Sequence, residues 1–145
     1  MKTLYVMATP IGNLDDMSAS LIKSLECCEV VFCESISSAQ RLYQSMGVKP
    51  PRLVRYWHKN EADVLQKCEH MVESYVGLIS DAGTPAISDP GYTLVNMFHK
   101  KGWTVKSIPG PCAAISALVM SGMSSESFCF SGFLAVKSAA RKRQL

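Results

Sequence analysis

Short apolar runs alternate along the chain with longer segments whose apolar residues recur at the spacing of one helical face. The short runs are rich in β-branched and apolar side chains, which is typical of buried strands. They predict strands at residues 3–7, 29–33, 53–57, 76–79 and 104–108. The helical spacing predicts a helix after the first loop, which Asp15, Asp16 or Ser18 could cap, and further helices at 37–46, 62–75, 92–101 and 112–120. This alternation predicts an α/β domain with a mostly parallel five-stranded sheet and helices on both faces.

The pattern changes after Gly122. Residues 127–134 read Ser-Phe-Cys-Phe-Ser-Gly-Phe-Leu, which predicts another strand with no helix after it. A lone strand needs partners, so it could join the edge of the main sheet, pair with a second chain or open a further domain. We therefore expect an α/β domain over residues 1–122, and a linker with the first strand of an incomplete second domain over residues 123–145.

Three loops rich in helix-breaking residues follow the first, fourth and fifth predicted strands, at 8–14, 80–91 and 109–113. In open α/β sheets ligands bind beyond the carboxyl ends of the strands, so the three loops could form one site. The loop at 80–91 holds twelve turn-forming, small or acidic residues. Such a long loop is typical of ligand binding, with a structural turn as the alternative. None of the three fits the dinucleotide or phosphate-loop fingerprint.

Composition adds little that is specific. The chain has 145 residues, 48% of them hydrophobic, and a net charge of +3, which suits one ordinary domain. The charge is uneven, because no acidic residue follows Glu126 while Lys137, Arg141, Lys142 and Arg143 crowd the end. That basic tail could meet phosphate or be a solvated terminus.

The cysteines show no C-x-x-C pair and no regular framework, so we expect reduced thiols and no metal site. Cys33 and Cys129 lie in apolar runs, where a free cysteine is expected to be buried. No segment predicts a signal peptide or approaches membrane-spanning length, so the sequence predicts a cytoplasmic protein with no membrane partner. The six cysteines are Cys27, Cys28, Cys33, Cys68, Cys112 and Cys129.

Four ordered segments carry a resemblance to a known family: residues 4–14, 80–91, 108–114 and 132–134. Together they resemble the tetrapyrrole methylase superfamily of S-adenosylmethionine-dependent methyltransferases. The likeness is strongest to the branch that methylates the ribose 2′-hydroxyl of a cytidine in small-subunit ribosomal RNA. Four motifs in order over nearly the whole chain form a specific signal.

The resemblance implies a two-domain enzyme in which an α/β domain and a second domain enclose S-adenosylmethionine. This chain would supply the first domain. The implied partners are ribosomal RNA or the small ribosomal subunit, and a second copy in a homodimer. The alternatives are a methylase of a tetrapyrrole or other small molecule, and a cofactor-binding fragment that is inactive without its second domain.

Carried over by position, the family's cofactor-lining segments fall in the three loops. Asp81 would accept a hydrogen bond from the ammonium of the cofactor, or would instead stabilise its own loop, as aspartate often does in turns. The cofactor-lining residues implied by the resemblance are Pro10, Ser80, Asp81, Gly83, Thr84, Pro85, Cys112 and Ala113.

Methyl transfer to a ribose hydroxyl also needs a group that accepts the hydroxyl proton. The candidates are Glu34, His58 and Glu61, and each has a structural alternative: a helix cap, packing on Trp57, or a favourable place in the first turn of a helix. Residues 34–37 read Glu-Ser-Ile-Ser where the RNA branch usually has Glu-Asp-Thr-Arg. The cofactor loops therefore match the family better than the substrate side does.

Overall fold

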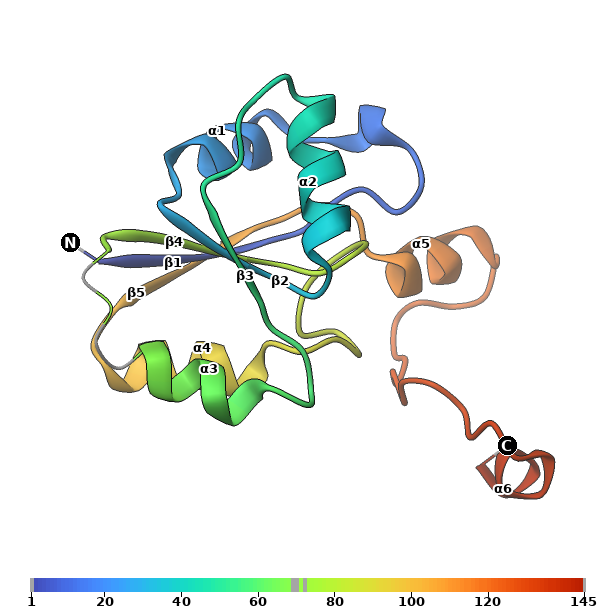
Figure 1. Cartoon of the computed structure of the whole chain (residues 1–145). Coiled ribbons are helices and arrows are strands. Elements are labelled where there is room, and N and C mark those ends of the chain that lie inside the picture. The colour runs from blue at the N-terminus through green and yellow to red at the C-terminus, as the bar shows by residue number, and fades with distance from the viewer. Residues whose placement is uncertain (1, 69–70, 72, 145) are drawn as a thin grey trace. The chain divides into compact units, whose positions relative to one another are not determined.

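The computed structural model describes residues 2–68, 71 and 73–144. Its centre is a sheet of five strands in the order β3-β2-β4-β1-β5 (Figure 1). All four pairings between neighbouring strands are parallel, which confirms the predicted sheet. The strands are β1 (Thr3–Met7), β2 (Val30–Cys33), β3 (Arg52–Arg55), β4 (Tyr75–Ile79) and β5 (Thr104–Ile108).

Two helices cover each face of the sheet, as predicted. Helices α1 (Ala19–Cys27) and α2 (Ile36–Ser45) lie on one face, and α3 (Glu61–Cys68) and α4 (Tyr92–Lys100) lie on the other (Figure 1). Of the three predicted caps, Ser18 is the one that acts on α1, because its hydroxyl accepts a hydrogen bond from the Leu21 N–H.

The core is divided by the sheet into two layers. All four residues of β2 are buried, and they point alternately to opposite faces. Val30 and Phe32 pack with α3 and α4, whereas Val31 and Cys33 pack with α1 and α2. This continuous apolar strand is typical of a parallel sheet that is covered on both sides.

Helix α3 ends at Cys68, earlier than the predicted 62–75. Residues 69, 70 and 72 lie outside the described part, and residues 71, 73 and 74 are not helical. Two lysines satisfy carbonyl groups near this end: Lys101 Nζ donates to the Cys68 carbonyl at 2.8 Å, and Lys2 Nζ donates to the Met71 carbonyl at 3.0 Å. Cations at the carboxyl end of a helix stabilise it there, which the apolar pattern alone did not indicate.

The chain forms two compact units, Met1–Ala113 and Ala114–Leu145. The second holds most of α5 (Ala113–Met120), which the spacing predicted, and the short α6 (Ser138–Gln144), which it did not predict. The strand predicted at 127–134 is wrong, since these residues form no strand in the structure. Phe128, Phe130 and Phe133 are exposed there, and no described strand pairs with the segment. An apolar run without hydrogen-bonding partners does not form a strand.

Cys27, Cys28, Cys33, Cys68 and Cys129 are free thiols, as expected. Cys33 is buried as predicted, whereas Cys129 is exposed because the segment around it forms no strand. Within the described residues, no helix is both long enough and apolar enough to cross a bilayer.

Gly77 in the middle of β4 has almost no room for a side chain. An added Cβ would lie 2.5 Å from Met7 Cε, 3.1 Å from Val31 Cγ2 and 3.2 Å from Cys28 Sγ. We expect Gly77→Ala to lower the free energy of unfolding by about 1–3 kcal/mol, the usual cost of overpacking a core. The measurement is urea unfolding. Combined with Met7→Ala, which opens space, the loss should be smaller than the sum of the two single losses, and strict additivity would contradict this packing account.

Candidate functional site

The candidate site lies where the chain leaves two neighbouring strands in opposite directions. After β1 it turns toward α1, and after β4 it turns toward α4, on the other face (Figure 1). Such a divergence at the carboxyl edge of a parallel sheet is where ligands bind in this architecture. Two backbone hydrogen bonds still join the loops: Thr9 N to Gly83 O at 2.9 Å and Gly83 N to Thr9 O at 3.1 Å.

The third loop, after β5, lies against the other two. The Ala8 N–H donates to the Ile108 carbonyl at 3.2 Å, and the Thr84 hydroxyl donates to the Pro111 carbonyl at 3.0 Å. An added Cβ on Gly110 would lie 3.0 Å from the Ala8 Cβ, so the loops pack closely. The structure thus brings the three predicted loops together at one edge of the sheet.

A hollow of about 290 Å³ opens between the first two loops and α2. Pro10, Ser80 and Asp81 border it, so three of the eight predicted cofactor residues share one cavity. Arg41 borders it from α2. The remaining lining residues are Thr9, Leu14, Ser38, Ala39, Leu42 and Ile79.

The other five predicted cofactor residues are grouped around the third loop and do not border this hollow. Gly83 and Pro85 are buried. Thr84 is half-buried, and its hydroxyl donates to the Pro111 carbonyl. Cys112 is half-buried, and Ala113 is exposed at the start of α5. The predicted set therefore divides into two groups, three residues that border the hollow and five that do not.

The loop at 80–91 holds two residues in strained backbone conformations. Ala86 and Ser88 have positive φ angles of 65° and 62°, which residues with a side chain rarely adopt. Backbone strain of this kind clusters at ligand-binding sites. The Ser80 hydroxyl stabilises the loop from within, because it donates to the carbonyls of Ala82 and Gly83.

Asp81 joins the second loop to α2. Its Oδ1 accepts a hydrogen bond from the Ser35 N–H at 3.1 Å, and the Ser35 hydroxyl in turn caps α2 by accepting from the Ser38 N–H. This bond joins the loop to a second segment, so it differs from the predicted alternative, in which Asp81 stabilises its own loop. The side chain is exposed and also borders the hollow, so this bond leaves carboxylate oxygen for a ligand.

Two further carboxylates gather around Asp81. Burial raises the pKa of Glu34 above its usual range, and the charges of Asp81 and Asp89 raise it further. Burial also raises the pKa of Asp89, with Asp81 adding to the effect. His58 acts in the opposite direction on both pKa values. The cluster is thus a place where negative charge is unfavourable and a cation would be stabilised.

The three candidate bases separate in the structure. Glu34 and His58 belong to this cluster. Glu61 does not, because its Oε1 accepts a hydrogen bond from the buried Tyr56 hydroxyl at 3.1 Å, and that hydroxyl also lies 2.6 Å from Thr93 Oγ1. Glu61 therefore has a structural role, because its bond to Tyr56 joins α3 to the segment after β3 and, through Thr93, to α4. It lies in the first turn of its helix, as the alternative expected.

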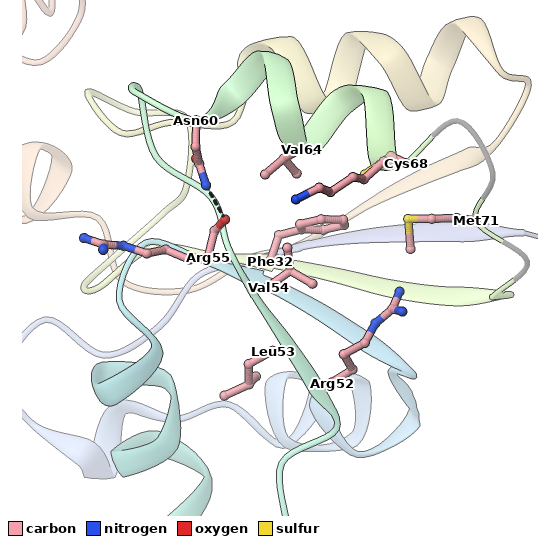
Figure 2. A pocket seen from close by; sticks show the side chains of 10 residues that line it. Phe32, Arg52, Leu53, Val54, Arg55, Asn60, Val64, Cys68 and Met71 are labelled. Atoms are coloured by element: carbon pink, nitrogen blue, oxygen red, sulfur yellow. Dashed lines mark hydrogen bonds between the residues drawn. The ribbon is translucent and has the colours of Figure 1, made fainter.

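A larger groove of about 610 Å³ runs between β3 and α3, along the edge of the sheet and away from the three loops (Figure 2). Phe32, Val54 and Val64 are among its apolar lining residues. Arg52 and Arg55 lie on β3 at its rim, and the carbonyl of Arg55 accepts a hydrogen bond from Asn60. Lys67 adds a third cation.

Sequence reading missed Arg41 and left Asp89 without a role. A signal existed for both. Arg41 follows Ser38 at helical spacing on the helix that leaves β2 at the same edge of the sheet, and Asp89 lies in the loop singled out for its composition. Arg41 belongs to no motif of the family resemblance. Asp89 lies within one, at 80–91, but is not among the residues that the resemblance assigns to the cofactor.

The fold and the joined loops define an α/β domain with a candidate ligand site at the carboxyl edge of its sheet. The model of the family described as Tetrapyrrole (Corrin/Porphyrin) Methylases matches residues 3–144, so the chain belongs to this family. Among curated relatives, it is 41% identical to a Ribosomal RNA small subunit methyltransferase I of Haemophilus influenzae, with 98% of this chain and 50% of the relative covered.

Two more relatives carry the same name. The one from Hydrogenobaculum sp. is 42% identical, with 93% of this chain and 60% of the relative covered. The one from Pseudomonas aeruginosa is 40% identical, with 99% and 51% covered. The chain thus spans about half the length of the curated relatives it matches.

The carboxylate cluster yields a prediction on stability. The pKa of Asp89 is raised in the folded protein, so the folded state holds this proton more tightly than the unfolded chain does. Ionisation of Asp89 therefore costs stability. The cost appears as the pH rises from the pKa of an unfolded aspartate to that of folded Asp89. We expect Asp89→Asn to raise the free energy of unfolding at pH 7 by less than about 1 kcal/mol, because the group is half-exposed, and so to raise the melting temperature. The gain should vanish near pH 3. Thermal melts at both pH values check this. Asp63→Asn, which removes an exposed carboxylate from α3, should give no gain.

Proposed function

We propose that this chain forms the donor-binding part of an S-adenosylmethionine-dependent methyltransferase. The proposed reaction is 2′-O-methylation of the ribose of a cytidine in small-subunit ribosomal RNA. The observation that carries the proposal is the joined pair of loops after β1 and β4, with their hollow, in a chain of the tetrapyrrole methylase family. The names of the relatives support the ribosomal RNA substrate over a tetrapyrrole.

The residues at the site fit this cofactor. S-adenosylmethionine supplies an electrophilic methyl group on a sulfonium, together with an amino acid end and an adenosine. The hollow has an apolar floor that includes Leu42 and Ile79, and it has Asp81 as an acceptor for an ammonium. We assign the second group of predicted residues to the adenosine, which needs close backbone approach and hydroxyl contacts: Gly83, Thr84, Pro85, Cys112 and Ala113.

Glu34 is the base that we favour. Glu61 is bonded to Tyr56, whereas Glu34 lies beside Asp81 at the site. Its raised pKa makes it a stronger base than an ordinary carboxylate, and the cluster would hold the proton that leaves the ribose hydroxyl. His58, which is exposed in the same cluster, is the second candidate.

Basic side chains along β3 support a nucleic acid partner. Arg52, Arg55 and Lys67 surround the groove of Figure 2, where a polyanion would be attracted. Arg52 is paired with Glu73 at 2.7 Å, and the Arg55 guanidinium lies 4.6 Å from the centre of the Trp57 ring. Arg55 also borders a further hollow beside the start of α2, and its Nε donates to the Glu34 carbonyl at 3.3 Å. An RNA strand held in the groove would thus approach the site.

The division into two domains and the homodimer are part of the same proposal. Met120, Phe133 and Val136 in the second unit are 83%, 87% and 94% exposed. Large apolar side chains exposed to this degree are often covered by another domain or chain in a folded protein. A second domain after the α/β domain, or a second copy, would provide that cover.

Two measurements test the proposed function. Calorimetric titration should show S-adenosylmethionine binding to this chain, with tighter binding to any longer form that adds the second domain. Labelled methyl from the cofactor should then appear on the 2′-oxygen of a cytidine in unmethylated small ribosomal subunits. The proposal would be abandoned if neither form bound the cofactor or transferred methyl.

A substitution of Glu34 tests the assignment of the base. In a form of the chain that transfers methyl, Glu34→Gln should lower kcat by about 10²- to 10⁴-fold, the usual contribution of a general base. The wild-type rate should fall as the pH drops through the raised pKa of Glu34, because the base must be ionised, and this limb should be lost in the variant. The matched control is Glu61→Gln, expected within a few-fold of wild type. A larger loss in Glu61→Gln would reverse the assignment.

A further inference from the structure

The hollow beside the first two loops carries two opposite charges from different elements. Arg41 borders it from α2, and Asp81 borders it from the loop after β4. The only ion pair in the described part of the chain joins Arg52 and Glu73, so Arg41 and Asp81 do not pair with each other. The polar contact that Arg41 makes is a long one, 3.4 Å from its Nη2 to the Ser38 hydroxyl. Its guanidinium therefore has donors to spare.

Opposite charges across a small hollow with an apolar floor match a ligand that carries both signs close together. An α-amino acid group has this chemistry, with a carboxylate and an ammonium on one carbon. We infer that Arg41 binds the carboxylate of the amino acid end of the methyl donor while Asp81 accepts from its ammonium. This inference rests on the proposed function and adds a residue that no motif of the sequence indicated.

Arginine suits this role physically. Its planar guanidinium can donate two parallel hydrogen bonds to a carboxylate, which gives orientation as well as affinity. The backbone at Arg41 is held firmly, because Leu42 and Tyr43 on the same turn of α2 are buried and the Tyr43 hydroxyl donates to the Leu25 carbonyl at 3.0 Å. The exposed Arg41 side chain can turn into the hollow from this fixed base.

A phosphate of an RNA substrate is the other anion that Arg41 could hold. The position of Arg41 favours the donor, because it shares its hollow with Pro10, Ser80 and Asp81, which the family resemblance assigns to the cofactor. The cations that surround the groove on β3 belong to a different cavity. RNA binding by Arg41 is therefore kept as an outcome of the test.

The experiment compares two ligands that differ only at the amino acid end. S-adenosylhomocysteine carries the carboxylate and ammonium and is neutral overall, whereas 5′-methylthioadenosine lacks both groups and is also neutral. Each is titrated calorimetrically into the wild-type chain and into Arg41→Ala, Arg41→Lys and Lys23→Ala. Lys23 is an exposed cation on α1 that does not border the hollow, so it controls for the loss of one charge.

We expect Arg41→Ala to weaken S-adenosylhomocysteine binding by roughly 10- to 100-fold, as for a lost hydrogen bond to a charged group. Binding of 5′-methylthioadenosine should change less than about two-fold, because it makes no bond to Arg41. Arg41→Lys should lie in between, since an ammonium keeps the charge but not the paired donors. Lys23→Ala should bind both ligands like the wild type.

The contrary outcomes are distinct. If Arg41→Ala weakened the binding of both ligands equally, Arg41 would have a structural role and the inference would be overturned. Unchanged S-adenosylhomocysteine binding would also overturn it, and weaker binding of a short single-stranded RNA by the same variant would then assign Arg41 to the substrate. If the wild-type chain bound 5′-methylthioadenosine and S-adenosylhomocysteine with equal affinity, the contact with Arg41 would be overturned while the proposed function would stand. Failure of the wild type to bind either would overturn the proposed function itself.

Discussion

The structure depends most on the pairing of β1 with β4 and its continuation past the ends of both strands. The chain leaves these neighbours toward opposite faces, so their loops would separate without a further constraint. Two backbone hydrogen bonds between Thr9 and Gly83 supply that constraint. They hold Pro10 on one loop beside Ser80 and Asp81 on the other, and so define the hollow. The site therefore follows from backbone topology first and from side-chain chemistry second.

Charge differs between the carboxyl edge of the sheet and the groove along β3. Carboxylates gather at the carboxyl edge of the sheet, where Glu34 and Asp89 have raised pKa values because they are partly buried beside Asp81. A sulfonium brought to this edge would relieve that repulsion. The cations along β3 lie in a separate groove, where they would attract a polyanion. One domain can thus meet a cationic donor and an anionic substrate without placing either against its own charge.

The sequence predicted the main sheet well because its inner strands β1, β2 and β4 are largely buried. Such strands read as continuous apolar runs between turn residues, and β1 and β5 have the predicted bounds. The pattern failed at 127–134, since an apolar run has the same signature whether or not a partner strand exists. It also could not reveal the hollow, because the contact of α2 with the loop after β4 is made by residues 46 positions apart in the chain. Loops were identifiable by composition, whereas their neighbours across space were not.

One hydrogen bond couples the two halves of the hollow. The Ser35 N–H that Asp81 accepts from lies immediately before α2, and Ser35 is also the cap of that helix. A change in the position of Asp81 would therefore move the start of α2, and with it the turn that carries Arg41. The helix is otherwise fixed by buried residues on its inner face, so the backbone positions that carry Arg41 and Asp81 keep a defined separation. The fold sets these positions before any ligand arrives, so only side chains need ordering when a small zwitterionic group binds, which lowers the cost of binding.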